Sequence, residues 1–398
     1  MKTFNAMLSP AELDSYQLRM LNAQLAYATA NSPFYADHLA DVVLPLESVQ
    51  DISSLPFTSA ADIEAHGMDM LCVGGDQIER IVTVQSSGSS GPPKRLYFTQ
   101  ADLDYTEKLF YEGMHYLCRP GDEAFIFMPA ATENSIGRLL EKGLHRMGAK
   151  PVVIGIPQDE EAAVEALRNG NPYTMVGIPS QIRKLSLLAP EIRPATVLLS
   201  ADYISMAVKD TIATNWQCQV FEHYGLTETA FGCAVECPAL QGQHVRYDDL
   251  HLEIVEVGGT QPVAEGQWGE IVITTLRREG MPLIRYRTGD VSRLVHGTCP
   301  CGNELPRLGR VLGRITELGR KLSIYELDET LLRCDGILDF RAAFEGGVLS
   351  IALEAAESEA YAACADILKE KWPSLPISIA PAHISAIGRN AKRVLQRS

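Results

Sequence analysis

Two hydrophobic patterns alternate along the first half of the chain, and together they predict an α/β fold. Alanine and leucine recur at helical spacing over residues 10–30, which predicts a helix there. Thr99 and Asp102 are suited to cap a second helix. Apolar runs predict strands at 123–129, 151–157, 173–179, 195–201 and 218–225, and amphipathic stretches predict helices at 101–117, 135–147, 159–168, 180–188 and 204–215.

Strands that are apolar along their whole length and separated by helices indicate a mostly parallel sheet covered on both faces. Ligands of such sheets bind beyond the carboxyl ends of the strands. Two predicted strands end in SADY (200–203) and EHYGLTE (222–228), so we expect a site there. From about residue 245 the pattern is rich in strands, and a break near 313–321 precedes a small acidic α/β segment. We therefore predict two domains, 1–313 and 314–398.

The composition is that of a globular protein and limits its partners. With 46% hydrophobic and 21% charged residues, the chain of 398 residues can bury a sizeable core. The formal charge of −15 argues against a general binder of nucleic acid or of anionic membranes, since both favour a basic face. No apolar run reaches the length of a membrane span, and the polar start does not resemble a signal peptide. The 9 cysteines are scattered, so we expect reduced thiols and a cytoplasmic location.

A stretch rich in serine and glycine, VQSSGSSGPPKRLYFT (84–99), is the first candidate site. Backbone N–H groups of such a loop can surround an anion, hydroxyl groups add donors, and Lys94 supplies a compensating charge. These properties suit a polyphosphate. On its own, such a run is more often a flexible surface linker, and the spacing of kinase-type phosphate loops is absent because two prolines follow Gly91.

Two further motifs follow predicted strands. EHYGLTETAFG (222–232) combines Tyr224, whose ring can stack on a base, with Thr227 and Glu228, which can hold a phosphate and a magnesium ion. RYRTGD (285–290) offers a carboxylate that can accept two ribose hydroxyl groups. Each motif alone is also compatible with ordinary loop chemistry, the second with a turn aspartate beside a glycine.

In this order, the three motifs resemble those of the adenylate-forming enzymes, which include acyl-CoA synthetases, adenylation domains of peptide synthetases and luciferases. LPFTSAADI (55–63), YFTQADLD (97–104) and CPCGNELPRLGRVLGR (299–314) are most similar to the phenylacetate–CoA ligase branch. The resemblance covers residues 15–318. It implies an α/β fold with a large N-terminal adenylating domain, which has mostly parallel sheets covered by helices plus a strand-rich subdomain, and a small C-terminal α/β lid domain.

The resemblance also implies a role for each motif. The β- and γ-phosphates of ATP would be held by Ser86, Ser87, Gly88, Ser89, Ser90, Gly91 and Lys94. Adenine would be lined by Ser200, Ala201 and Asp202, with Tyr224 and Gly225 against it. The α-phosphate would contact Thr227, magnesium would be bound by Glu228, and ribose would be held by Asp290 and Arg314.

The C-terminal part departs from the family pattern. The usual Gly-Arg-x-Asp hinge reads Gly-Arg-Ile-Thr at 313–316, so the pivot would be Thr316 or Glu317. In the tail AIGRNAKRVLQRS (386–398), alignment on Arg-Val places Asn390 where the family has its catalytic lysine. Lys392 or Arg389 would serve there only with a local shift, and we select Lys392. A terminal basic run is also compatible with a solvated tail.

By position, residues 131–140 and 177–181 border the acyl pocket. We select Ile136, Leu140 and Gly177 as its lining, although residues such as the first two more often belong to an ordinary helix core. Aryl acids fit the nearest relatives, and aliphatic acids stay open.

Two separated cysteine pairs indicate a possible metal site. CAVEC (233–237) lies just past the second motif, and CPCG (299–302) lies far downstream. Thiolates and an imidazole suit tetrahedral zinc, and free thiols are the alternative. Relatives of the phenylacetate–CoA ligase type carry a metal at the matching positions. The predicted structural zinc ligands are Cys237, His244, Cys299 and Cys301, with Cys233 as the competitor of His244.

The resemblance therefore implies an AMP-forming carboxylate–CoA ligase. ATP with Mg²⁺ would activate a small carboxylic acid, pyrophosphate would leave, and the acyl group would pass to coenzyme A. Two alternatives are adenylation with transfer to another acceptor and a nucleotide-binding protein without turnover. Lys94 and Glu228 argue against the second alternative, because a structural role does not require them. A homodimer is expected only because symmetric pairs are common.

Overall fold

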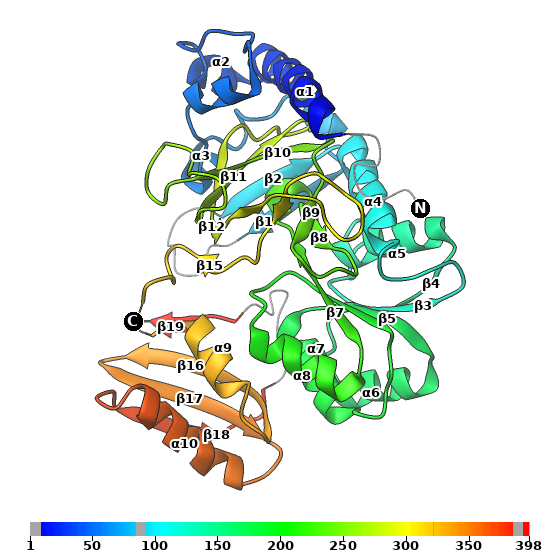
Figure 1. Ribbon diagram of the computed structural model, residues 1–398, viewed down its shortest axis with the longest axis vertical. Coiled ribbons are helices and arrows are strands. Elements are labelled where there is room, and N and C mark those ends of the chain that lie inside the picture. The colour runs from blue at the N-terminus through cyan, green and yellow to red at the C-terminus, as the bar shows by residue number, and fades with distance from the viewer. Residues whose placement is uncertain (1–8, 85–92, 321, 385–392, 398) are drawn as a thin grey trace. The chain divides into compact units, whose positions relative to one another are not determined.

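The computed structural model describes residues 9–84, 93–320, 322–384 and 393–397. The chain forms two compact units, whose elements are labelled in Figure 1. Unit 1 comprises Met1–Tyr116 and His223–Thr316, and unit 2 comprises Leu117–Glu222 and Glu317–Ser398. Strand β7 (Gln219–Tyr224) supplies residues to both. Among the described residues, no helix is both long enough and apolar enough to cross a membrane.

Unit 1 is built on antiparallel strands. Its helices are α1 (Pro10–Asn31), α2 (Pro33–His38), η1 (Val49–Ser54), α3 (Ala60–His66), η2 (Gly75–Gln77), α4 (Gln100–Met114) and η3 (Thr227–Thr229). Its strands are β1 (Arg80–Val84), β2 (Lys94–Phe98), β8 (Ala234–Glu236), β9 (Gln243–Val245), β10 (Leu250–Val255), β11 (Gly269–Thr275), β12 (Tyr286–Ser292), β13 (Leu294–Val295), β14 (Arg307–Leu308) and β15 (Gly313–Arg314). Within this unit β1 pairs with β2, β10-β11-β12-β15 form one sheet, and β13-β14-β9-β8 join the end of β7.

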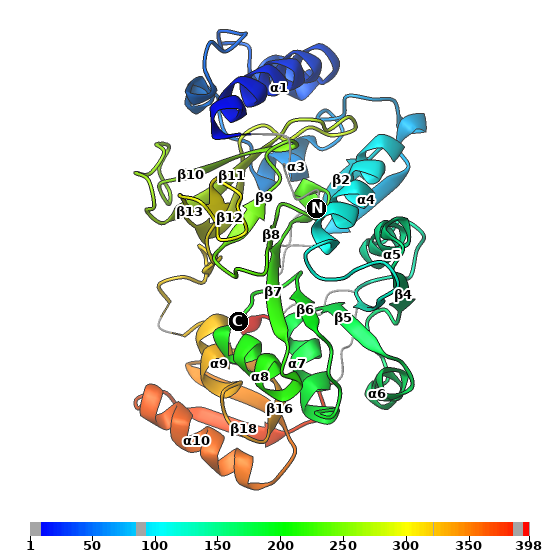
Figure 2. The same ribbon diagram turned by 45° about the vertical axis from the view of Figure 1, so that its right-hand side comes forward.

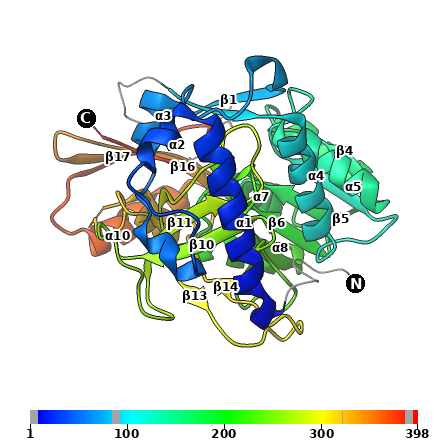
Figure 3. The ribbon, with the colours of Figure 1, turned by 90° about the horizontal axis from the view of Figure 1, so that it is seen from above.

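Helix α1 lies across β10 and β11, as Figure 3 shows from above. The buried amide of Gln17 donates to the carbonyl groups of Tyr247 and Leu250 at 3.0 and 2.9 Å, and that of Gln24 donates to Arg278 at 2.9 Å. These bonds satisfy backbone groups at the start of β10 and just after β11, so the helix fixes the ends of both strands.

Unit 2 contains a parallel sheet with strand order β4-β3-β5-β6-β7. Besides β7, the elements of this part are β3 (Glu123–Phe127), α5 (Ile136–Met147), β4 (Lys150–Val153), α6 (Glu160–Asn169), β5 (Pro172–Gly177), α7 (Pro179–Leu188), β6 (Thr196–Leu199) and α8 (Met206–Trp216). Successive residues of β6 are all buried, and since they point to opposite faces, both faces of the sheet are covered. Figure 2 shows α6, α7 and α8 side by side against the strands.

The rest of unit 2 is a second sheet with strand order β18-β17-β16-β19. Its elements are α9 (Ile324–Leu331), β16 (Ile337–Glu345), β17 (Val348–Ala355), α10 (Glu359–Lys371), β18 (Ile377–Pro381) and β19 (Leu395–Arg397). Strands β16 and β17 are antiparallel, and β18 and β19 join them in parallel. One hydrophobic cluster runs through both sheets of unit 2, from Phe127 and Trp216 to Leu327 and Ile351.

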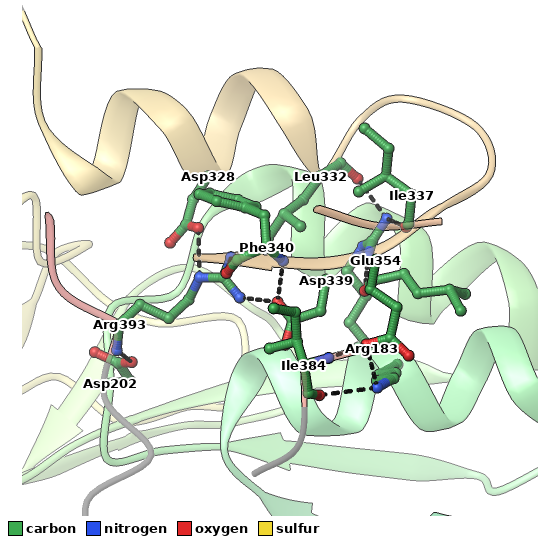
Figure 4. Close-up of polar contacts among 12 residues, drawn as sticks. Arg183, Asp202, Asp328, Leu332, Ile337, Asp339, Phe340, Glu354, Ile384 and Arg393 are labelled. Atoms are coloured by element: carbon green, nitrogen blue, oxygen red, sulfur yellow. Dashed lines mark hydrogen bonds and ion pairs between the residues drawn. The ribbon is translucent and has the colours of Figure 1, made fainter. Parts of the chain in front are cut away.

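Two adjacent basic residues of α7 hold the two parts of unit 2 together (Figure 4). The guanidinium group of Arg183 donates to the carbonyl groups of Leu332, Ile337 and Leu338 at 2.9 to 3.0 Å. The ammonium group of Lys184, whose side chain is 5% exposed, pairs with Glu160 and with Glu354. A buried charge is stable only when it is paired, so these contacts fix α7 against β16 and β17.

Arg393 makes a second set of contacts in unit 2 (Figure 4). Its backbone N–H donates to Asp202 at 2.8 Å, and its guanidinium group pairs with Asp328 and Asp339. Arg393, two residues before β19, is thereby anchored to the loop after β6, to α9 and to β16.

The predicted elements between residues 10 and 225 are confirmed, apart from shifts at their ends. The predicted strand 151–157 is too long, because β4 ends at Val153 and Gly155 takes a φ of +79°, which turns the chain. The capping role of Thr99 and Asp102 is confirmed at the start of α4. The domains 1–313 and 314–398 stay a prediction; the compact units change over between Thr316 and Glu317.

We predict that Lys184→Met lowers the free energy of unfolding by about 3 kcal/mol, because it leaves two largely buried carboxylates without their cation. Denaturant titration followed by circular dichroism measures this change. The control is Arg168→Met, which removes an exposed ion pair with Glu191 and is expected to cost less than about 1 kcal/mol. Equal losses in both variants would contradict the role given to Lys184.

Candidate active site

Residues from three motifs meet around one carboxylate in unit 1. Lys94 opens β2, Glu228 lies in η3, and Tyr286 opens β12. The ammonium group of Lys94 forms an ion pair with Oε1 of Glu228, and the hydroxyl group of Tyr286 donates to the same oxygen at 2.8 Å. Lys94 Nζ also lies 3.3 Å from the Tyr286 hydroxyl group. Segments that are 134 and 58 residues from Glu228 thus converge on it.

The charges of this cluster are set by burial and pairing. Burial acts to raise the pKa of Glu228, but the charge and hydrogen bond of Lys94, with help from Tyr286, outweigh it and hold the pKa below its usual value of 4.5. Burial, and then the charge of Glu228, raise the pKa of Tyr286 far above its ordinary range. Glu228 is therefore ionised at neutral pH, and Tyr286 keeps the proton that it donates.

A second carboxylate lies in the same strand as Tyr286. Oδ2 of Asp290 accepts a hydrogen bond from the hydroxyl group of Tyr224 at 2.9 Å, and Oδ1 forms an ion pair with Nε of Arg314 at 2.9 Å. The pairing of β12 with β15 places Asp290 opposite Arg314. Both oxygens of a carboxylate are hydrogen-bond acceptors, which is the property that a site for ribose hydroxyl groups requires.

The turn that carries Glu228 depends on the glycine before it. A Cβ atom at Gly225 would lie 2.3 Å from the carbonyl oxygen of Phe231, so a larger residue there would displace the turn. Thr227 begins η3 and is partly exposed, and its carbonyl group accepts the N–H of Ala230 at 3.1 Å. Thr227 therefore lies at the start of the same turn as Glu228.

The other residues predicted for the active site either lie outside the described residues or belong to unit 2. The predicted phosphate-loop residues from Ser86 to Gly91, and Lys392, lie outside the described residues. Six predicted residues belong to unit 2: Ser200, Ala201 and Asp202 follow β6, Ile136 and Leu140 lie in α5, and Gly177 ends β5.

Two of these unit 2 residues have features that sequence reasoning did not foresee. Ala201 has a φ of 73°, a left-handed conformation that is rare for a residue with a side chain and common at functional sites. The carboxylate of Asp202 accepts the backbone N–H of Arg393, as described above. The adenine-lining role of both residues stays a prediction.

The four predicted zinc ligands come together in unit 1. Cys237 follows β8, His244 lies in β9, and Cys299 and Cys301 precede β14; their ligand atoms all lie within 4.8 Å of one another. The sulfur atoms of Cys237 and Cys299 are 3.6 Å apart, and that of Cys301 is 3.4 Å from Nε2 of His244. Burial, and then the charge of Arg307, lower the pKa of His244 to about 4.

Three thiols and a neutral imidazole at these distances match the donor set of a tetrahedral zinc ion. The competitor Cys233 lies elsewhere: it is fully buried in a hydrophobic cluster with Ala234 and Tyr247. Among the described residues, the structure therefore separates Cys233 from the other candidates.

Sequence reasoning missed Tyr286, Arg246 and Arg278. Tyr286 stands inside the quoted motif RYRTGD, so its position was available although its contact was not. The two arginines bind backbone carbonyl groups of η3, at Thr229 and Glu228, and no spacing in the sequence indicates this.

Comparison with known proteins decides the family. A family model described as AMP-binding enzyme matches residues 53–276, more than half of the chain. The chain belongs to the AMP-binding enzyme family. Its relatives include phenylacetate-coenzyme A ligases from Thermus thermophilus, 26% identical over 323 residues (77% of this chain and 71% of the relative), and from Escherichia coli K12, 27% identical over 322 residues (77% and 72%).

Solved structures share the fold of this chain. Crystal structures of 2-hydroxyisobutyryl-CoA ligase in the postadenylation state, with an acyl-AMP bound, match with TM-scores of 0.80 and 0.81 at 20% identity, over 98% of this chain and 90% of the other. A benzoate CoA ligase from Burkholderia xenovorans LB400 matches with a TM-score of 0.55 at 15% identity, over 80% of this chain and 68% of the other. The predicted family, its phenylacetate–CoA ligase-like branch and the α/β fold are confirmed.

We predict that Lys94→Met destabilises the protein more at about pH 7.5 than at about pH 4. In the wild type, Lys94 holds the pKa of Glu228 below 4.5. Without the ammonium group, we expect burial to raise this pKa above 4.5. The folded variant then holds a proton that the unfolded chain releases, so its stability decreases as the pH rises above 4.5. Thermal unfolding of the variant and the wild type across this range measures the difference. A loss of stability independent of pH would contradict the pairing.

Proposed function

We propose that this AMP-binding enzyme activates a small carboxylic acid with ATP and transfers the acyl group to coenzyme A, as an AMP-forming carboxylate–CoA ligase. The observation that supports this most directly is the meeting of Lys94, Glu228 and Tyr286 from the three motifs around one buried carboxylate. The named relatives, which are phenylacetate-coenzyme A ligases, support the same reaction class.

In the first half-reaction, a carboxylate oxygen of the acid bonds to the α-phosphorus of ATP. The bond from that phosphorus to the bridging oxygen breaks, and pyrophosphate leaves. The residues contribute mainly position and charge. The Lys94 ammonium group would neutralise phosphate oxygens, and Asp290, held by Tyr224 and Arg314, would accept ribose hydroxyl groups.

Glu228 is the residue that would hold Mg²⁺, because it is an ionised carboxylate beside the proposed phosphate site. When bound, Mg²⁺ supplies positive charge to the phosphate oxygens. Thr227, which is partly exposed at the start of the same turn, would contact the α-phosphate.

In the second half-reaction, the sulfur atom of coenzyme A bonds to the acyl carbon, the thiol loses its proton, and AMP leaves. The sequence of the tail gives the specific reason to keep a second candidate. Asn390 stands at the family's lysine position, so transfer to an acceptor other than coenzyme A is the alternative. Lys392 stays the proposed closing lysine.

The acyl pocket is proposed from position alone. Ile136 and Leu140 of α5 and Gly177 at the end of β5 would line it. A Cβ atom at Gly177 would lie 2.6 Å from the side chain of Ile182, so the glycine is required for packing as well. Aryl and aliphatic acids are both candidates. The cytoplasmic location and the homodimer stay predictions.

The test is pyrophosphate–ATP exchange with a panel of carboxylic acids, followed by AMP release with and without coenzyme A. We predict exchange with at least one acid and AMP release that depends on the thiol. Glu228→Gln should lower the exchange rate about 100-fold, the scale on which losing one electrostatic group lowers kcat. Glu265→Gln, at an exposed glutamate, is the control and should exchange normally.

Each other result of this test has a definite meaning. Exchange without thiol-dependent AMP release would favour the alternative acceptor. No exchange with any acid, in protein that still binds ATP, would contradict the proposed activity. Normal exchange by Glu228→Gln would remove Glu228 from the active site.

We also infer that Cys237, His244, Cys299 and Cys301 bind a structural zinc ion, since their donor atoms fit it. Such an ion would link β8 and β9 to the loop before β14. Its four protein ligands would leave no open position for a reacting water molecule.

We predict about one zinc ion per chain in protein purified without added metal, measured by elemental analysis. Cys299→Ser should lose the zinc and melt at least about 5 °C lower, because the ion no longer holds the loop. Cys233→Ala, which removes a buried thiol outside the cluster, should keep its zinc. Wild-type protein without zinc would leave the cysteines as plain thiols.

A further inference from the structure

Two buried arginines hold the backbone of the turn that carries Glu228. Nη2 of Arg278, from the loop after β11, donates to the carbonyl oxygen of Glu228 at 2.9 Å. Nη2 of Arg246, which follows β9, donates to the carbonyl oxygen of Thr229 at 2.7 Å. Both guanidinium groups thus bind main-chain atoms of η3, and the carboxylate of Glu228 is left to Lys94 and Tyr286.

The next carbonyl group of the turn is held in the same way. The hydroxyl group of Thr106, in α4, donates to the carbonyl oxygen of Ala230 at 3.1 Å. Three consecutive carbonyl groups therefore each accept a bond from a different part of unit 1. The backbone hydrogen bonds within the turn are enough to close it, so these side-chain bonds to its carbonyl groups are additional.

The backbone of this turn is strained, which explains the extra bonds. Ala230 and Phe231 have φ values of 53° and 71°, and left-handed conformations are unfavourable for a residue with a side chain. Such conformations persist only where the surroundings fix them. Phe231 is also held through its ring, which stacks on Phe98 with centroids 5.7 Å apart.

The burial of the two arginines indicates a specific role. Arg246 and Arg278 are only 5% and 8% exposed, and a buried guanidinium group is costly unless its donors are used. Arg246 is neutralised by Asp249 at 3.0 Å. Arg278 lies over the ring of Phe98 at 4.7 Å. Their planar groups are fixed in orientation, so each acts as a rigid support for one carbonyl group.

We propose that Arg246 and Arg278 are positioning residues that fix the main chain of Glu228, so that its carboxylate faces the Mg²⁺ of bound ATP. This rests on the proposed function, in which Glu228 holds that ion. The arginines touch neither the reacting atoms nor the carboxylate; they act through the backbone. Supports of metal ligands generally change metal affinity or activity 10- to 100-fold when they are removed.

The experiment compares Arg278→Gln with Arg277→Gln, the neighbouring position. Arg277 is exposed and bonds to the Tyr16 hydroxyl and the Asp248 carbonyl, away from η3, so it is a matched control. Isothermal titration with ATP, in Mg²⁺ and in EDTA, measures the part of the affinity that depends on the ion. Arg278→Gln should lose about 10- to 100-fold of the Mg²⁺-dependent part and keep its affinity in EDTA, and Arg277→Gln should match the wild type.

A double-mutant cycle with Glu228→Gln tests whether Arg278 acts through Glu228. If it does, adding Arg278→Gln to Glu228→Gln causes no further loss, whereas independent roles would add. Arg278→Lys should recover part of the Mg²⁺-dependent affinity for ATP, because an ammonium group can still donate to the Glu228 carbonyl group. If circular dichroism shows that Arg278→Gln does not fold, the Mg²⁺-dependent ATP affinity of Arg278→Lys is compared with that of the wild type instead.

Three results would overturn the proposal. They are a wild-type Mg²⁺ dependence in both Arg278 variants, an additive double mutant, and equal losses in Mg²⁺ and EDTA. ATP binding without any Mg²⁺ dependence in the wild type and in Arg277→Gln is a different failure. It would remove the proposed function of Glu228 itself, and the positioning role with it.

Discussion

The buried carboxylate of Glu228 is the constraint on which the candidate active site depends. A charge that is removed from water is costly unless it is paired and hydrogen-bonded, and Lys94 and Tyr286 meet that requirement together. Lys94 lies in β2 and Tyr286 in β12. The contacts that stabilise the charge of Glu228 therefore also hold these two strands against η3. The site is assembled because its charges must be balanced.

The same balance prepares the site for a nucleotide. In the proposed reaction, Glu228 would hold Mg²⁺, which would supply positive charge in place of the ammonium group, and Lys94 would neutralise phosphate oxygens. Asp290, held by Tyr224 and Arg314, would accept the ribose hydroxyl groups. Mg²⁺ would thus leave the Glu228 carboxylate beside a cation, which a buried charge requires.

The sequence predicted most of the fold, because the central strands of the parallel sheet in unit 2 are apolar on both faces and helices alternate with them. The strand 151–157 was predicted too long, because a left-handed Gly155 ends it before the apolar run ends. Arg183 and Lys184 were missed, since charges on a helix are usually solvated. Most of their acceptors, such as Leu332 and Glu354, are far away in the sequence, so no local pattern reveals them.

The active site was predicted unevenly for a similar reason. Lys94, Glu228 and Asp290 stand in motifs of the family and were identified from them. The hydroxyl group of Tyr286 reaches Glu228 only because of the place of β12 beside η3. Arg246 and Arg278 bind carbonyl groups, which every residue has, so sequence alone does not say which carbonyl an arginine will meet.

The most direct test of the account is a crystal structure with Mg²⁺ and a non-hydrolysable ATP analogue. The account predicts that the ion lies on the Glu228 carboxylate, that Lys94 faces phosphate oxygens and that the ribose hydroxyl groups lie on Asp290. A nucleotide bound elsewhere, or one that leaves the pair of Lys94 and Glu228 intact, would contradict it.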